Sequence, residues 1–145
     1  AASAVIVAAF GDPGASALSH RLRVPVVGIG TAAAQAAVAL GRPFAVATTT
    51  PELERPINLL LHQAGGAYLG CFFAVGDPLA LLSDQAAFDA GLIGAVRAAA
   101  GAGAEQVIIG GGPLADAAER IAEAVPVPLI QPIPEACKAV QALMR

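Results

Sequence analysis

Two loops of this sequence hold the residues that could bind or convert a ligand. The first, FGDPG at 10–14, follows the apolar run VIVAA, and the second, GGGPL at 110–114, follows the run VII. Residues 5–14 align with residues 107–116, so the same strand–loop–helix unit occurs twice. Neither loop contains Cys, His, Lys or Glu, which leaves backbone N–H groups and the Asp12 carboxylate. Loops at the carboxyl ends of parallel strands are where α/β proteins bind ligands.

A third candidate is the run Thr48-Thr49-Thr50, which ends an apolar stretch just before Pro51. Its hydroxyl and N–H groups suit a carboxylate or phosphate, although Thr also commonly caps a following turn. Gly110, Gly111 and Gly112 allow a ligand to approach the backbone closely. The N–H groups of a helix that begins near Leu114 favour an anion there. The alternative is that the glycine loop is only a flexible turn.

Asp12 is a candidate general acid or base, but we favour a role as the N-cap of the helix that follows it. The stretch Gly28–Ala33 fits the pattern G-x-G-x-x-A, which can bind a pyrophosphate at a helix N-terminus. The next strand ends in Thr rather than in the expected acidic residue, so dinucleotide binding is a minor alternative. His20 and His62 lie late on predicted helices, and Cys71 and Cys137 are expected to pack as small apolar residues.

The pattern of apolar residues predicts the strands and helices that position these loops. Continuous rather than alternating apolar runs predict strands that are covered on both faces of a mainly parallel sheet. The predicted strands are Ala2–Ala9, Val24–Ile29, Phe44–Thr48, Leu69–Val75, Gln106–Ile109 and Pro128–Ile130. The predicted helices are Asp12–Arg21, Thr31–Leu40, Pro56–Gln63, Gln85–Ala100, Leu114–Ala124 and Pro134–Met144. Arg120 is expected on the solvent-facing side of the fifth helix. The alternation of strands and helices predicts an α/β fold.

Composition excludes several classes of protein. The 145 residues are 57% hydrophobic and 13% charged, and the formal net charge is −3. The scattered basic residues argue against nucleic-acid binding. No apolar run reaches the roughly 18 residues of a membrane-spanning helix, so we expect no membrane partner. Two cysteines without metal-ligand spacing predict neither a metal site nor a disulfide framework, and indicate a cytoplasmic protein.

The order of these motifs resembles a known family. The stretch "VIVAAFGDPG…VPVVGIGTAAAQAAVALGRPFAVATTT", followed by "AEQVIIGGGPLAD…VPLI", is similar to the aspartate/glutamate/hydantoin racemase superfamily, above all to its hydantoin and allantoin racemases. The resemblance implies two pseudo-symmetric lobes with parallel, doubly wound sheets and an active-site cleft between them. The first lobe would comprise residues 1–41 and 126–145, and the second 42–125. It also implies cofactor-independent racemisation of a small carboxylate, hydantoin or ureide, and we expect a homo-oligomer.

The chain departs from the family pattern at the positions that carry the reaction. In the family, one cysteine removes the α-proton of the substrate and a second delivers a proton to the opposite face, but this chain has Ala9 and Gly111 at those positions. The N-terminal segment of the family, which contains an Asn-Thr-Ser loop, is also not found in this sequence. Either the segment is missing from the sequence, or the protein dispenses with it. The substrate-binding positions would be Phe10, Gly11, Asp12, Thr48, Thr49, Gly112, Pro113 and Leu114. The alternatives are a lyase that resembles arylmalonate decarboxylase and a non-catalytic small-molecule binding module.

Overall fold

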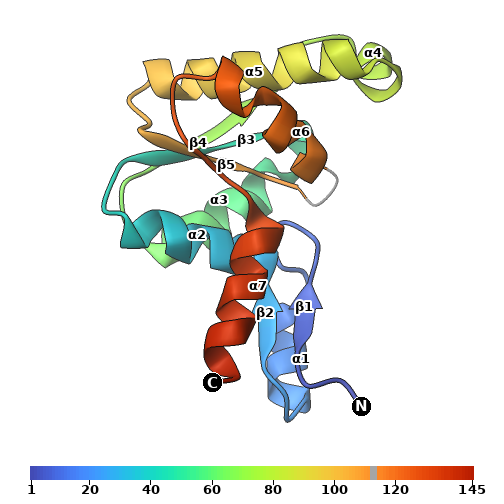
Figure 1. Ribbon diagram of the computed structural model, residues 1–145, viewed down its shortest axis with the longest axis vertical. Helices are drawn as coiled ribbons and strands as arrows, with labels where there is room; N and C mark the ends of the chain where they lie inside the picture. Colours follow the sequence, from blue (N-terminus) through green and yellow to red (C-terminus); the bar gives the residue numbers. More distant parts are fainter. Residues whose placement is uncertain (112–113) are drawn as a thin grey trace.

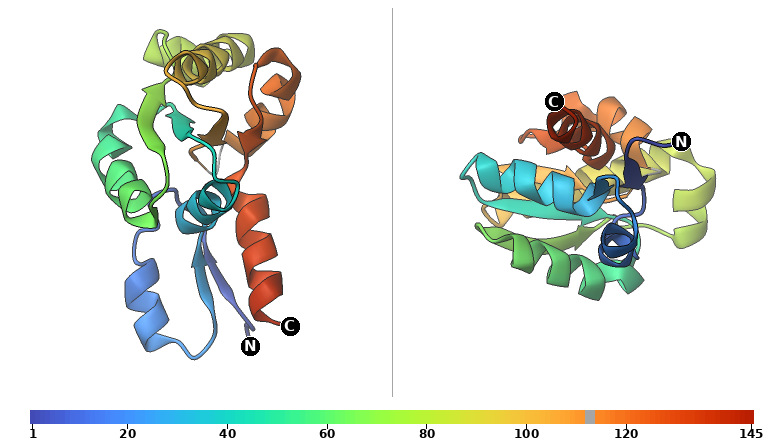
Figure 2. Two further views of the ribbon diagram at one scale, coloured as in Figure 1. Left: turned by 90° about the vertical axis from the view of Figure 1, so that its left-hand side faces the viewer. Right: turned by 90° about the horizontal axis from the view of Figure 1, so that it is seen from below.

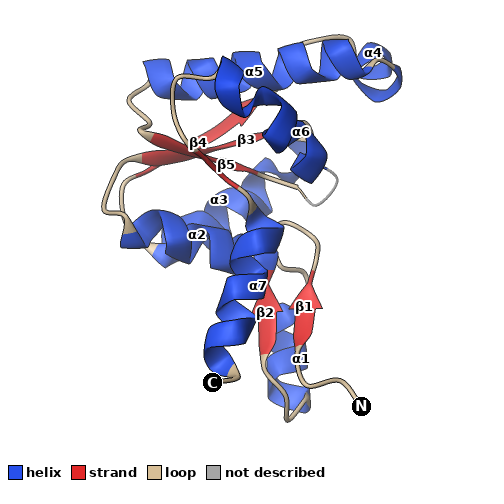
Figure 3. Cartoon of the chain, in the orientation of Figure 1, coloured by secondary structure: helices blue, strands red, loops and turns tan. Residues whose placement is uncertain are grey.

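The computed structural model describes residues 1–111 and 114–145, so the predicted site residues Gly112 and Pro113 lie outside the described part. Strands and helices alternate along the chain (Figures 1 and 3). The strands are β1 Val5–Val7, β2 Val26–Gly28, β3 Phe44–Thr48, β4 Tyr68–Phe73, β5 Gln106–Ile109 and β6 Leu129–Ile130. The α-helices are α1 Ala15–Arg21, α2 Ile29–Ala39, α3 Glu54–Ala64, α4 Pro78–Ser83, α5 Gln85–Gly101, α6 Ala115–Ile121 and α7 Pro132–Leu143, with short 3₁₀ helices at Pro51–Leu53 and Ala122–Ala124.

The larger sheet has four strands in the order β4-β3-β5-β6, and every neighbouring pair is parallel. Its central strands β3 and β5 are buried at every residue, as their continuous apolar sequences predict. Helices α5 and α6 cover one face of this sheet, and α2 and α3 cover the other (Figure 1). The predicted α/β class with doubly wound parallel strands is therefore confirmed.

The smaller sheet consists of β1 and β2, which also pair in parallel. It lies beside α1 and the end of α7, away from the larger sheet (Figure 2). In its register Val5 is opposite Val26, and in the larger sheet Val107 is opposite Leu129. Val5 and Val107 are equivalent positions of the sequence repeat, so both copies of the repeat form a strand–loop–helix unit that leads to a neighbouring parallel strand.

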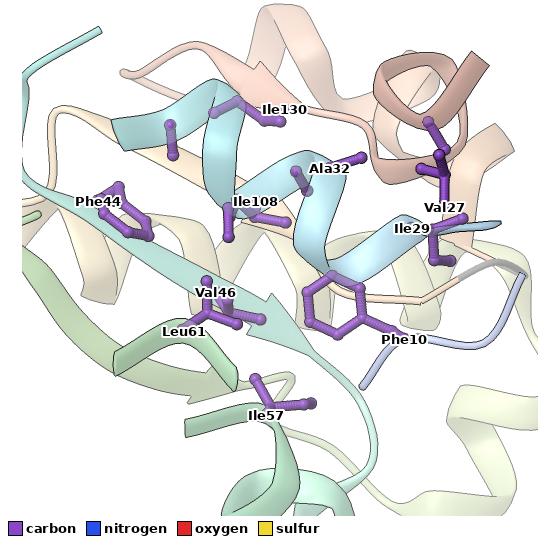
Figure 4. Close-up of a cluster of buried hydrophobic side chains, with 14 residues drawn as sticks. Phe10, Val27, Ile29, Ala32, Phe44, Val46, Ile57, Leu61, Ile108 and Ile130 are labelled. Carbon is purple, nitrogen blue, oxygen red and sulfur yellow. The ribbon is translucent and has the colours of Figure 1, made fainter. Parts of the chain in front are cut away.

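Helix α2 lies next to the larger sheet and shares one apolar cluster with it. This cluster joins Ile29 and the alanines of α2 to Phe44, Val46 and Ile108 of the sheet, and also includes Phe10 and Val27 (Figure 4). Small side chains on α2 allow the helix to approach the sheet closely, and Ala33, Ala34 and Ala37 are fully buried. The division into lobes at residue 41 stays a prediction.

Several element bounds differ from the sequence-based predictions, and β1 is shorter at both ends than the predicted Ala2–Ala9. Helix α1 begins at Ala15 instead of Asp12, and its N-cap is Gly14 with no side-chain hydrogen bond. The predicted role of Asp12 as the cap of this helix is therefore wrong, because the residues Asp12 to Ala15 form a turn before the helix begins. Helix α2 begins two residues earlier than predicted, and α4 was not predicted. None of the described helices is long and apolar enough to cross a membrane.

Candidate functional site

The candidate site lies where the chain changes direction across the larger sheet. From β3 the chain adds β4 on one side, and it then crosses to add β5 on the other side of β3. In open parallel sheets the carboxyl ends of two such strands border the crevice in which ligands bind. Here the bordering residues are Thr48 at the end of β3 and Ile109 at the end of β5.

A cavity of about 800 Å³ occupies this position. Of the predicted site residues, it brings together Ala9, Phe10, Thr48, Thr49, Gly111 and Leu114. The cavity therefore includes both positions at which the family resemblance implies cysteines. Gly11 and Asp12 do not line it, but line a second cavity of about 610 Å³ between α1, α2 and α3.

Two consecutive β-turns build the first loop of the cavity. The Asp12 N–H donates to the Ala9 carbonyl at 3.0 Å, and the Ala15 N–H donates to the Asp12 carbonyl at 3.2 Å. Gly11 and Gly14 occupy the third positions of these turns with φ values of 105° and 77°. A β-turn with positive φ at its third position favours glycine there, which explains the spacing G-D-P-G.

The Asp12 side chain caps a helix distant in sequence. Its carboxylate accepts hydrogen bonds from the Gly30 and Thr31 N–H groups, both at 2.7 Å, and from the Thr31 hydroxyl. These donors form the N-terminus of α2, where a G-x-G-x-x-A turn would bind a pyrophosphate. The structure contradicts the dinucleotide alternative, because the protein's own carboxylate occupies that position.

The first loop rests directly on the second. The Phe10 side chain is 7% exposed and belongs to the apolar cluster beside α2. A Cβ atom at Gly110 would lie 2.7 Å from Val46 Cγ1 and 3.3 Å from Phe10 Cε1. Only glycine therefore fits between β3 and the Phe10 ring without displacement of a neighbour, and this contact sets how closely the two loops approach.

Several donors that the sequence suggested for a ligand are already engaged. The Thr48 hydroxyl donates to the Gly110 carbonyl at 2.8 Å. The Gly111 N–H donates to the Ile109 carbonyl at 3.2 Å, and the Leu114 N–H donates to the Gly111 carbonyl at 3.3 Å. By contrast, the N–H groups of Thr49 and Thr50 find no acceptor among residues 1–111 and 114–145. The N–H groups at the end of β3 are therefore more available to a ligand than the N–H groups of Gly111 and Leu114.

The rest of the cavity wall combines apolar side chains with polar and charged ones, which include Asp84, Gln85 and Arg120. The apolar side chains are those of Leu53, Leu81, Leu82 and Phe88, two of them on the unpredicted helix α4. Arg120 of α6 also lines the cavity instead of facing only solvent, and its guanidinium pairs with both Asp89 oxygens at 2.8 and 2.9 Å. The hydrogen bond to Asp89 raises the pKa of Arg120. Arg120 is exposed, as the sequence pattern predicted, but its pairing with Asp89 of α5 is a long-range contact that the pattern did not predict.

Neither cysteine lines the cavity. Cys71 lies on β4, where its sulfur is 3.3 Å from the Tyr68 hydroxyl, and Cys137 is exposed on α7. Burial raises the pKa of the Cys71 thiol, although the hydrogen bond with Tyr68 lowers it. Burial is also the main reason that the pKa of Tyr68 is raised. Within the described part of the chain, no group of three or more His, Cys, Asp or Glu residues could hold a metal ion.

The fold and the site define a class of protein: a parallel α/β protein with a ligand-sized cavity at the switch point of its larger sheet. The sequence pattern described as Asp/Glu/hydantoin racemase matches residues 1–140, and the chain belongs to this family. It is 34% identical over 145 residues to a hydantoin racemase from Rhizobium meliloti, an alignment that covers 97% of this chain and 60% of that protein.

Solved structures agree with this assignment. The crystal structure of allantoin racemase from Pseudomonas fluorescens superposes with a TM-score of 0.87 at 30% identity, and covers 99% of this chain and 62% of that one. Arylmalonate decarboxylase superposes with a TM-score of 0.71 at 17% identity, over 98% of this chain and 68% of the other, which supports the shared fold alone. The chain spans about 60% of the length of the curated relatives that it matches.

Proposed function

We propose that this chain binds a small carboxylate, hydantoin or ureide in the cavity at the carboxyl ends of β3 and β5, without two-thiol racemisation. The observation that carries the proposal is that Ala9 and Gly111 line one cavity. These are the two positions at which the family resemblance implies proton-carrying cysteines. On this proposal the site keeps the arrangement of a racemase site, while its two reactive positions carry no acid or base.

The cavity suits a ligand of this kind. Its volume of about 800 Å³ lies within the range of roughly 300–1,000 Å³ that is common for small-molecule sites. Thr49 and Thr50 supply N–H donors for a carboxylate or ring carbonyl, and Arg120, paired with Asp89, supplies its remaining guanidinium N–H groups. The leucines of the wall and Phe88 would contact an apolar substituent.

Racemisation by proton transfer needs an acid and a base on opposite faces of the reacting carbon. A methyl group at Ala9 and a hydrogen atom at Gly111 can neither accept nor donate a proton. Cys71 and Cys137 lie outside the cavity, so they do not replace the missing thiols. Binding without this reaction is accordingly the function that the described residues support.

Calorimetric titration with hydantoin, allantoin, aspartate and glutamate, together with polarimetry of the same mixtures, tests the proposal. We expect saturable binding of at least one ligand and no change in optical rotation. Racemisation of any of these compounds would overturn the non-catalytic part of the proposal, and failure to bind any of them would overturn the proposed ligand class.

A double variant with A9C and G111C tests whether the architecture is that of a racemase. A side chain at position 111 would place its Cβ 3.2 Å from Leu114 Cγ, so the variant is also made with L114V to provide space. We expect racemisation to appear only when both thiols are present. The matched controls are the single variant A9C and the double variant with A9S and G111S, which we expect to bind but not to turn over ligand. Activity in either control would contradict a two-thiol site.

A further inference from the structure

We propose that Asp12 is a positioning residue that holds the first loop of the cavity in place by capping helix α2. Its carboxylate receives three hydrogen bonds from Gly30 and Thr31. Gly30 lies 18 residues further along the chain, so this cap is a tertiary contact between a loop and a helix. The role in ligand binding rests on the proposed function above, whereas the anchoring of the loop does not.

The turn at the start of α2 is shaped to receive this carboxylate. A Cβ atom at Gly28 would lie 2.1 Å from Asp12 Cγ, and one at Gly30 would lie 2.9 Å from Asp12 Oδ1. Real Cβ atoms do not approach other heavy atoms so closely, so each position accommodates Asp12 only as glycine. The two glycines of the motif Gly-Ile-Gly-Thr therefore leave the space that the side chain of Asp12 occupies.

Among the described residues, the hydrogen bonds of the Asp12 carboxylate are the main contacts that hold the second half of the loop to the rest of the protein. Asp12 has a φ of 56°, a conformation that is uncommon for residues other than glycine and that needs support from its surroundings. Two turn hydrogen bonds hold the loop together internally, but neither joins it to the rest of the protein. The carboxylate contacts connect it to α2, whose first residue Ile29 is fully buried.

The position of Asp12 determines where two cavity residues lie. Ala9 and Phe10 belong to the same β-turn as Asp12, since the Asp12 N–H closes that turn on the Ala9 carbonyl at 3.0 Å. The Phe10 ring holds one end of this turn against Gly110, and the carboxylate holds the other end against α2. Ala9 is the first residue of this turn, its carbonyl accepts the hydrogen bond from the Asp12 N–H, and it lines the cavity. Release of Asp12 would free the turn on one side and let the residue at position 9 move.

A double-mutant cycle tests the contact itself. D12A removes the carboxylate, and G28A forces it out by steric collision, so either variant alone should lower Tm by about 5 °C. The three atoms nearest to a Cβ at position 28 all belong to the Asp12 carboxylate, so we expect D12A/G28A to be no less stable than the less stable single variant. The matched control is G94A, a helical position with no atom within 4 Å of the added Cβ. Additive losses in the double variant would overturn the proposal.

A thiol at position 9 reports the position of the loop without any ligand. In A9C, alkylation by iodoacetamide is followed by peptide mass spectrometry, which separates this thiol from the two native cysteines. We expect A9C/D12A to react at least three-fold faster than A9C, and we expect formate not to restore the slower rate, because free formate can cap α2 but is not joined to the loop. Restoration of the slower rate by formate would overturn the positioning role, because it would show that capping of α2 alone is sufficient. If D12A does not fold, D12N serves in its place, with a smaller increase in rate because one amide oxygen can still accept.

The two proposals can fail separately. If the introduced thiol becomes more reactive on loss of Asp12 and formate does not reverse the change, Asp12 positions the loop even if hydantoin does not bind to the native chain. In that event only the proposed function fails. If the rate is the same with and without Asp12, the positioning role is overturned, whether or not hydantoin binds.

Discussion

The hydroxyl of Thr48 donates a hydrogen bond of 2.8 Å to the carbonyl of Gly110, and this bond joins the ends of β3 and β5 across the crevice between them. Thr48 is 2% exposed, so water does not compete for either group. The same two strand ends are joined by the Gly110 N–H, which donates to the Ala47 carbonyl at 2.8 Å. The floor of the cavity is therefore fixed by side-chain and main-chain bonds together.

Replacement of Thr48 by Val should destabilise the protein by about 1–3 kcal/mol, because it leaves the Gly110 carbonyl buried without this donor. The change is close to isosteric, so packing changes little. Equilibrium unfolding in urea measures the effect. T48S keeps the hydroxyl and is expected to retain most of the stability, so an equal loss in T48S and T48V would show that packing, and not the hydrogen bond, is responsible.

Replacement of Gly110 by Ala should cost about 1–3 kcal/mol, the usual penalty for overpacking a core. The added Cβ would lie 2.7 Å from Val46 Cγ1 and would press on the Phe10 ring. V46A in the same chain should recover part of the loss by making space. As a matched control, G94A in α5 meets open space and should stabilise the protein by about 0.5–1 kcal/mol. Thermal or urea unfolding of G110A, G110A/V46A and G94A distinguishes a local clash at position 110 from a general effect of added methyl groups.

The two native cysteines should differ in reactivity. Burial raises the pKa of the Cys71 thiol, so less of it is thiolate at pH 8, whereas Cys137 is exposed. Since the thiolate is the nucleophile, we expect iodoacetamide to modify Cys137 first, as followed by peptide mass spectrometry. Faster modification of Cys71 in the folded protein would contradict the burial of its sulfur.

The raised pKa of Cys71 also predicts a dependence of stability on pH. The folded state holds the thiol proton more tightly than the unfolded state, so the contribution to stability is full below the ordinary thiol pKa of about 8.5 and declines as pH rises above it. Urea unfolding at a series of pH values from 7 to 10 measures this decline. C71A should show a smaller decline than the native chain over the same range, and an identical decline would exclude Cys71 as the source.

Local sequence signals predicted the parts of the fold that depend on neighbouring residues. The buried strands β3 and β5 have the predicted bounds, because their apolar runs are continuous and end at polar residues or glycine. The sequence repeat and the turn glycines also located the two loops of the cavity. Asp12 was misassigned because a carboxylate beside a helix start caps that helix in most proteins, whereas here the Pro13-Gly14 turn directs it to another helix.

Arg120 is exposed as predicted, but its place in the cavity wall depends on the contact between α5 and α6, which helical periodicity alone does not encode. The pairing with Asp89 became evident only from the packing of these helices. Helix α4 was missed because it has six residues and none of them is buried, although Asp77 caps it and Pro78 is at its first position. Its leucines contribute to the cavity all the same.

The position of Arg120 predicts a selective effect on ligand binding. R120Q removes the positive charge from the cavity wall while keeping a polar side chain of similar length. We expect affinity for carboxylates such as aspartate to fall on the order of tenfold, the usual effect of losing one charge-assisted hydrogen bond, and affinity for uncharged hydantoin to change little. The matched control is D89N, which weakens the pair but keeps the cation, and which should retain carboxylate binding. Calorimetric titration of the three chains with both ligands measures this, and an equal loss for both ligands in R120Q would mean that Arg120 supports the fold of the cavity and does not recognise charge.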